Sequence, residues 1–213
     1  MRYKAILFDM DGTLLDTLTD MADAVNHILS VHGWPLRTTE EVRAFVGNGA
    51  RRLMKRAVPP EVTGGDFETV LTEYRDWYQA HNCVATAPYP GIPALLAALA
   101  KAGIKTAVVS NKPDATTKTL AARFFPGLPA FGQRDDVPPK PAPNLVFHAL
   151  ETLGVDAADA IYVGDSEVDV ATARNAGLPL AAVSWGFRGR RALAEAGAAV
   201  IVDTAAELLE VLR

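Results

Sequence analysis

The sequence is poor in cysteine, and its one cysteine, Cys83, excludes any disulfide within the chain. No window approaches the roughly 20 consecutive apolar residues that a membrane-spanning helix needs. Arg2 and Lys4 lead directly into an apolar segment at the amino terminus, which leaves no room for a removable signal peptide. These features predict a protein of the reducing cytoplasm with no membrane partner.

Excess charge of one sign is also lacking. Lysine and arginine total 21 against 25 acidic residues, a formal net charge of -4. A protein that binds nucleic acid through the phosphate backbone carries a basic surface, so we expect no nucleic-acid partner. With 49% hydrophobic and 22% charged residues, the composition is that of an ordinary globular protein. Any anionic ligand must therefore be attracted by local groups.

Two aspartates follow the apolar run at residues 5–8, in the stretch Asp9-Met10-Asp11-Gly12-Thr13. Residues two apart on an extended backbone point the same way, so Asp9 and Asp11 can face one small space. Two carboxylates that close repel unless a proton or a cation lies between them. Oxygen ligands favour a hard cation such as Mg2+. The alternative is that one aspartate only caps a helix beginning after Gly12.

The pattern of apolar residues predicts an α/β fold. Apolar runs at 5–8, 104–110, 130–131, 160–163, 180–184 and 198–202 read as strands, and most are separated by segments of helical periodicity. Strands that alternate with helices form a parallel sheet with helices on both faces. Residues from about 16 to 86 are helical throughout. We therefore expect a core of residues 1–15 and 87–213 and an inserted all-helical cap domain, residues 16–86.

Ligands of such sheets bind beyond the carboxyl ends of the strands, a rule that brings Asp9, Asp11, Ser110 and Asp165 to one edge. Ser110 could equally cap a helix. Lys140 lies among several prolines, so a long side chain can be aimed from a stiff backbone. Its alternative interpretation is a solvated loop lysine.

Four sequence blocks, taken in order, resemble those of the haloacid dehalogenase superfamily of aspartate-based phosphohydrolases. They are Asp9-Met10-Asp11-Gly12-Thr13, Val108-Val109-Ser110-Asn111-Lys112, Lys140-Pro141-Ala142-Pro143 and Gly164-Asp165-Ser166-Glu167-Val168-Asp169. The resemblance implies a Rossmann-like core and a small phosphorylated metabolite as substrate. It also implies a bound Mg2+ with Asp9, Asp11 and Asp165 as ligands.

The same resemblance implies roles for individual residues. Asp9 would attack phosphorus and form an aspartyl-phosphate, while Asp11 would act as general acid and base. Ser110, Asn111 and Lys140 would bind the phosphate. Asp169 would orient Lys140 or a metal-bound water. A phospho-accepting receiver module also gathers acidic residues at a sheet edge, but it lacks the second aspartate and the long insertion.

We expect the inserted segment to determine the substrate specificity. Its loop Gly47-Asn48-Gly49, followed by Arg52, is similar to that of bacterial phosphoglycolate phosphatases, and Trp185-Gly186-Phe187 adds to the likeness. We expect Gly47, Asn48 and Arg52 to bind the substrate, with Arg52 as the partner of a carboxylate. The alternative for Arg52 is that it belongs to a solvated basic face. The alternatives to a phosphoglycolate phosphatase activity are a pyrophosphatase, a sugar-phosphate phosphatase or a phosphomutase. Either a monomer or a homodimer is compatible with the sequence.

Overall fold

A computed structural model describes residues 2–213, and the chain divides into two compact units, which are described separately. The first unit holds the chain up to Asp16 together with Pro88–Arg213. The second, which we call the helical unit, is Thr17–Ala87. No helix of the described chain is long and apolar enough to cross a membrane.

A six-stranded parallel sheet forms the centre of the first unit, as the alternating pattern predicted. Its order is β5-β4-β1-β6-β7-β8, which places β1 between the strands that carry the second and fourth sequence blocks. The strands are β1 Ala5–Phe8, β4 Lys105–Pro113, β5 Ala130–Gln133, β6 Ala160–Gly164, β7 Leu180–Val183 and β8 Ile201–Val202.

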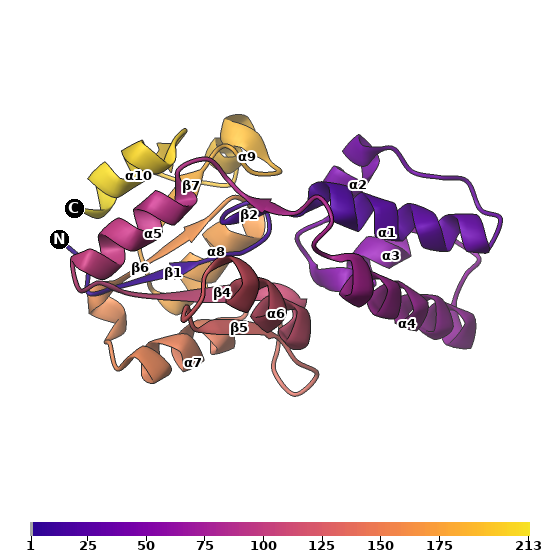
Figure 1. The fold of residues 1–213 in the computed structure, drawn as a ribbon, viewed down its shortest axis with the longest axis horizontal. Helices are drawn as coiled ribbons and strands as arrows, with labels where there is room; N and C mark the ends of the chain where they lie inside the picture. The colour runs from indigo at the N-terminus through magenta and orange to yellow at the C-terminus, as the bar shows by residue number, and fades with distance from the viewer. Residues whose placement is uncertain (1) are drawn as a thin grey trace. The chain divides into compact units, whose positions relative to one another are not determined.

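Helices cover both faces of this sheet. In Figure 1, α5 and α10 lie on one side and α7 lies on the other. The helices of this unit are α5 Ile92–Lys101, α6 Asp114–Phe124, α7 Asn144–Leu153, α8 Glu167–Ala176, α9 Gly189–Glu195 and α10 Ala205–Leu212, with a 3-10 turn at Ala157–Asp159.

Two strands differ from the expectation. β4 continues three residues beyond Ser110, to Pro113. The last strand is only Ile201–Val202, because Ala198 donates its backbone N–H to the Leu193 carbonyl and closes α9 instead of joining the sheet. Alanines, which are frequent from α9 to Ala199, give little periodic signal, so α9 was not predicted either.

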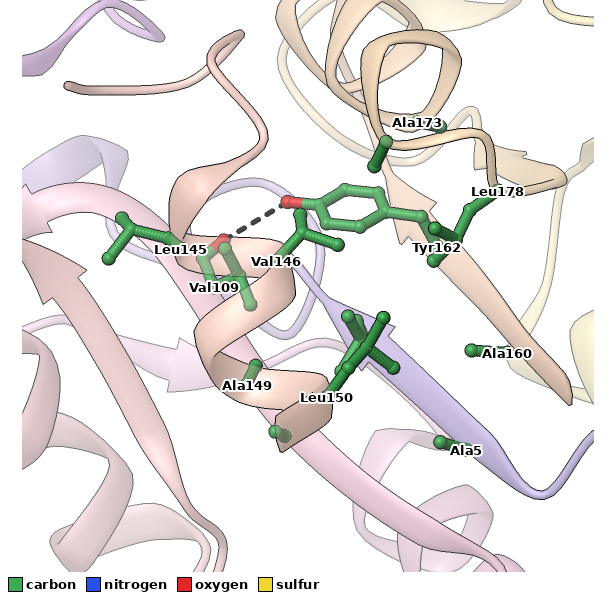
Figure 2. Packing of buried hydrophobic residues seen from close by; sticks show 13 residues of the cluster. Ala5, Val109, Leu145, Val146, Ala149, Leu150, Ala160, Tyr162, Ala173 and Leu178 are labelled. Carbon is green, nitrogen blue, oxygen red and sulfur yellow. Dashed lines mark hydrogen bonds between the residues drawn. The ribbon is translucent and has the colours of Figure 1, made fainter. Parts of the chain in front are cut away.

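One face of the sheet packs against α7 and α8. Alternate residues of β1, β4 and β6 point to this side, among them Leu7, Val109 and Tyr162, and they meet Val146 and Leu150 of α7. Figure 2 shows Tyr162 reaching across this layer toward the backbone of Val109. The buried apolar layer thus holds the carboxyl ends of three adjacent strands at fixed positions.

The helical unit is built from α1 Leu18–Val31, α2 Thr39–Phe45, α3 Gly49–Ala57 and α4 Gly64–His81. A capping box begins α2: Thr38 Oγ1 accepts from the Glu41 N–H at 3.2 Å, and the Glu41 carboxylate accepts from the Thr38 N–H at 2.7 Å. Leu53 and Met54 of α3 are buried. The glycine-flanked turn separates α2 from α3.

The segments that lead into and out of the helical unit lie together. β2, Leu15–Asp16, pairs with β3, Ala87–Pro88, as a two-stranded sheet. Inside the helical unit, Asp20 is 1% exposed and ties the exit segment to the start of α1. Its carboxylate accepts from the N–H groups of Val84, Ala85 and Thr86 at 3.1, 2.8 and 2.9 Å. The Thr86 hydroxyl donates a fourth bond at 2.6 Å.

We predict that Asp20→Ala destabilises the helical unit by about 2–4 kcal/mol, because three backbone N–H groups and the buried Thr86 hydroxyl would lose their acceptor. The exposed neighbour Asp23 supplies the control, and Asp23→Ala should change stability by less than about 0.5 kcal/mol. Thermal and urea unfolding followed by circular dichroism measure both. Equal stability of the two variants would contradict the clamping role of Asp20.

Candidate active site

The first aspartate pair lies where β1 ends. The Asp9 N–H donates to the Val163 carbonyl at 2.9 Å, which keeps Asp9 in register with β6. The chain then turns at Gly12, whose φ of 81° lies in the left-handed region. No helix begins there, since α1 starts at Leu18, so neither aspartate caps a helix. The side chains of Asp9 and Asp11 remain 13% and 15% exposed.

Lys140 is the centre of a buried charged cluster. Its Nζ lies 3.0 Å from Asp9 Oδ1, 2.9 Å from Asp169 Oδ1 and 2.9 Å from the Tyr162 hydroxyl. The side chain is 1% exposed, so Lys140 is not a solvated loop lysine. The Asn111 side chain fixes its backbone: Oδ1 accepts from the Lys140 N–H at 2.7 Å, and Nδ2 donates to the Lys140 carbonyl at 3.0 Å.

The charges of this cluster determine its protonation. Burial alone would lower the pKa of Lys140, but the Asp169 and Asp9 carboxylates raise it well above its ordinary value. Burial raises the pKa of Asp9 to about 7, with Asp169 and Asp11 adding to the shift and Lys140 opposing it. Lys140 is therefore a fixed cation, whereas Asp9 carries a charge that its surroundings disfavour.

Asp165 follows directly on β6 and is 1% exposed. Its Oδ1 accepts from the Thr13 hydroxyl at 3.2 Å and its Oδ2 from the Phe187 N–H at 2.7 Å. Two glycines make room for this carboxylate: a Cβ on Gly12 or on Gly186 would lie 2.3 Å from Asp165 Oδ2. Burial raises the pKa of Asp165 well above its ordinary value, and the Asp169 and Asp9 carboxylates raise it further.

Both oxygens of Asp169 are engaged. Oδ1 pairs with Lys140, and Oδ2 accepts from the N–H and hydroxyl of Ser166 at 3.1 and 2.6 Å. Ser166 in turn caps α8, where it and Asp169 form a capping box. The helix start thus orients Asp169, and Asp169 in turn pairs with Lys140.

Asp9, Asp165 and Asp169 could together hold a metal ion, since each offers a carboxylate oxygen within 4.8 Å of the others. An all-oxygen donor set suits a hard divalent cation. A cation would also relieve the repulsion that raises the pKa of Asp9 and Asp165. Asp169 is committed to Lys140 and Ser166, so Asp9 and Asp165 fit the ligand role better. Asp11, which we predicted as a third ligand, is not a member of this group.

The end of β4 carries the second block. Ser110 Oγ accepts from the Lys112 N–H at 3.2 Å, and because α6 begins only at Asp114, Ser110 is not a helix cap. The amide of Asn111, predicted to bind substrate, bonds the Lys140 backbone. Lys112, which was not predicted as a site residue, is 3% exposed at its side chain, and its Nζ lies 3.1 Å from Asp11 Oδ2.

Tyr162 was also missed. It lies inside β6, where a buried aromatic reads as core, yet its hydroxyl accepts from Lys140 and donates to the Val109 carbonyl at 3.1 Å (Figure 2). Glu167, a member of the fourth block, pairs with Arg188 at 3.0 Å. The only signal for Tyr162 is its hydroxyl on a strand whose neighbours are apolar, because a buried phenol requires a partner.

The substrate-binding candidates of the helical unit lie in and after the turn before α3. Arg52 Nη1 donates to Asn48 Oδ1 at 2.9 Å, and Gly47 adopts a φ of 111°. Arg51 instead forms a bidentate pair with Glu68 at 2.6 and 2.7 Å. Arg52 also lines a hollow of about 410 Å³ on this unit. Its other lining residues are Arg51, Lys55, Thr63, Gly64, Phe67 and Glu68.

Comparison with known proteins identifies relatives over the whole chain. The family model of haloacid dehalogenase-like hydrolases matches residues 6–183. An N-acetylmuramic acid 6-phosphate phosphatase from Pseudomonas aeruginosa is 37% identical, covering 100% of this chain and 96% of the relative. A phosphoglycolate phosphatase from Cupriavidus necator is 36% identical, covering 94% of this chain and 89% of the relative.

Solved structures agree in fold. A crystal structure from Lactobacillus delbrueckii subsp. bulgaricus, provisionally described as a phosphoglycolate phosphatase, superimposes with a TM-score of 0.94 at 37% identity. The match covers 100% of this chain and 99% of that one. Both units therefore have their counterparts in one known structure.

We predict that Asp9→Asn stabilises the metal-free protein in alkaline solution. The pKa of Asp9 is about 7 in the folded protein against an ordinary value of 3.8, so ionised Asp9 destabilises the fold above pH 7. This penalty shrinks as the pH falls toward 4. The gain should be roughly 1–4 kcal/mol at pH 8 and less than half of that at pH 5.

Urea unfolding in the presence of a chelator measures this gain at both pH values. Asp135→Asn, which neutralises an exposed aspartate of the same unit, should change stability little at either pH. A gain from Asp9→Asn that did not change between pH 5 and pH 8 would show that ionisation of Asp9 is not its cause.

Proposed function

The chain belongs to the haloacid dehalogenase-like hydrolases and is a phosphatase acting on phosphate monoesters, and from this premise we propose that it hydrolyses 2-phosphoglycolate to glycolate and phosphate. The reaction is proposed to depend on Mg2+ and to pass through an aspartyl-phosphate. The observation that carries the proposal is the position of Asp9, a carboxylate at a strand end whose orientation is set by Lys140.

The contacts of Asp9 support its role as nucleophile. Oδ1 accepts from the Met10 N–H at 2.7 Å and pairs with Lys140, whereas no donor within residues 2–213 bonds Oδ2. Oδ2 attacks phosphorus, the bond from phosphorus to the ester oxygen breaks, and Asp11 gives its proton to the departing alkoxide. Water then attacks the aspartyl-phosphate while Asp11 takes up the proton of the water, and phosphate leaves.

Several groups compensate for charge in this site. Lys140, held between Asp9 and Asp169, supplies a fixed positive charge beside the transferring phosphoryl group. The Ser110 hydroxyl and the adjoining backbone N–H groups are proposed to bind the phosphate oxygens. Asp9 and Asp165 would hold the magnesium ion, which when bound offsets negative charge on the carboxylates and the phosphate.

The substrate is proposed to carry a carboxylate as well as a phosphate. The names of the two relatives specify phosphoglycolate and N-acetylmuramic acid 6-phosphate, and both compounds are acids esterified with phosphate. We propose that the helical unit, predicted from the sequence as residues 16–86, acts as the cap domain. Within it, Arg52 Nη1 donates to Asn48 Oδ1, and glycines flank Asn48. We propose that Gly47, Asn48 and Arg52 receive the carboxylate.

A sugar-acid phosphate is the second candidate substrate. Its support is the relative that acts on N-acetylmuramic acid 6-phosphate, which matches over 100% of this chain. Pyrophosphatase and phosphomutase activities gain no comparable support.

We predict that the purified protein releases phosphate from 2-phosphoglycolate with magnesium and not in excess chelator. Asp9→Asn should abolish turnover, because an amide cannot act as the nucleophile. When the wild-type protein is quenched with acid during turnover of a substrate labelled with radioactive phosphate, the label should be found on Asp9. Parallel assays with N-acetylmuramic acid 6-phosphate and an aryl phosphate rank the substrates. Label on a serine or histidine would overturn the covalent scheme.

We predict that Arg52→Ala lowers kcat/KM for the carboxylate-bearing substrate by roughly 10- to 150-fold. This range corresponds to a charge-assisted hydrogen bond of about 1.5–3 kcal/mol. Hydrolysis of an aryl phosphate that has no carboxylate should barely change, since it never makes that contact.

Arg75→Ala, which removes an exposed arginine from α4, serves as the control and should affect neither substrate. An equal loss on both substrates would mean that Arg52 supports the helical unit itself. No loss on either would place the carboxylate partner elsewhere.

A further inference from the structure

Lys112 is a buried cation that the proposed chemistry does not use. Its side chain is 3% exposed, and its Nζ lies 3.1 Å from Asp11 Oδ2. Burying an ammonium group is costly unless a charged partner compensates, and burial of a single long side chain also sacrifices rotamer freedom. The charged partner of Lys112 is Asp11, the residue that transfers the proton under the proposed function.

The backbone of Lys112 is fixed on both sides. Its N–H donates to Ser110 Oγ at 3.2 Å, and its carbonyl accepts from Thr117 Oγ1 at 3.1 Å. Gly132 of β5 packs against the same carbonyl, and a Cβ there would lie 2.7 Å from Lys112 O and 2.5 Å from Asp114 Cα. The side chain thus starts from a defined point at the end of β4.

Asp11 lies in a turn whose backbone is closed by the bond from the Gly12 N–H to the Leu15 carbonyl, and its side chain is 15% exposed. Proton transfer to a leaving group requires the donor within hydrogen-bond reach, and a misplacement of about 1 Å can cost on the order of 100-fold in rate. An ammonium group on one carboxylate oxygen fixes the rotation of the whole group. The strand end of β4 therefore adds a charged contact to the Asp11 side chain, beyond the hydrogen bonds that hold the backbone of its turn.

We propose that Lys112 is a positioning residue that orients Asp11 for proton transfer to the leaving alkoxide. The proposal rests on the proposed role of Asp11 as general acid. It differs from a role of Lys112 in binding the phosphoryl group, because its effect depends on how strongly the leaving group needs a proton. A basic alkoxide needs one, whereas a nitrophenolate departs without it.

The test compares Lys112→Met, which keeps the length of the side chain and removes its charge, on two substrates. kcat/KM reports the steps through phosphoryl transfer to Asp9, so it isolates departure of the leaving group from later hydrolysis. We expect kcat/KM to fall about 100-fold for the best alkyl phosphate of the substrate panel and at most about 3-fold for p-nitrophenyl phosphate. A difference between the substrates below about 5-fold overturns the proposal.

A double-variant cycle tests whether Lys112 acts through Asp11. In the Asp11→Asn background, adding Lys112→Met should produce no further loss on the alkyl phosphate, since the oriented group is already gone. A further loss of 10-fold or more, or equal losses on both substrates in the single variant, would show that Lys112 contacts the phosphoryl group directly and would overturn the proposal.

Two more variants control for folding. Lys118→Met removes an exposed lysine of α6 that pairs with Asp114, and it should leave both activities unchanged. Lys112→Arg keeps the charge, so it should retain more alkyl phosphate activity than Lys112→Met if orientation is the role, and no advantage over Lys112→Met would overturn the proposal. Wild-type protein that releases phosphate from no ester at all would instead refute the proposed function.

Discussion

The ion cluster around Lys140 is the interaction on which the rest of the site depends. Its ammonium group lies within 3.0 Å of both Asp9 and Asp169, and the Tyr162 hydroxyl accepts its remaining bond. Each partner comes from a different element, so the cluster is complete only when β1, β6, α8 and the Lys140 loop are all in place. Removing the lysine would leave two buried carboxylates uncompensated, which costs far more than a surface ion pair contributes.

The buried carboxylates of this cluster lower the stability of the folded protein. Asp9, Asp165 and Asp169 lie within reach of one cation, and burial disfavours the ionised forms of Asp9 and Asp165. A hydrophobic core in the same place would hold the strands together more firmly. The apolar layer between the sheet and α7 supplies the stability that the charged edge lacks (Figure 2).

Much of the fold and part of the site could be predicted from the sequence. Apolar runs located the parallel sheet, and the rule that ligands bind beyond the carboxyl ends of strands placed Asp9 and Asp165 at one edge, where Lys140 and Asp169 also lie. Tyr162 could not be predicted in the same way, because a tyrosine inside an apolar strand reads as core although its hydroxyl bonds Val109. Nothing in the sequence singles out Asp11 as the partner of Lys112. A strand of two residues, such as Ile201–Val202, is too short for its bounds to be predicted, because the apolar residues before it continue the same run.

The pairing of β2 with β3 has a consequence for how such chains can diversify. Because Leu15–Asp16 lies beside Ala87–Pro88, the helical unit enters and leaves through neighbouring strands, and a short connection could in principle replace it. The sheet would then close its own chain without depending on the inserted sequence. The helical unit could thus be lengthened, shortened or replaced without breaking any strand of the six-stranded sheet.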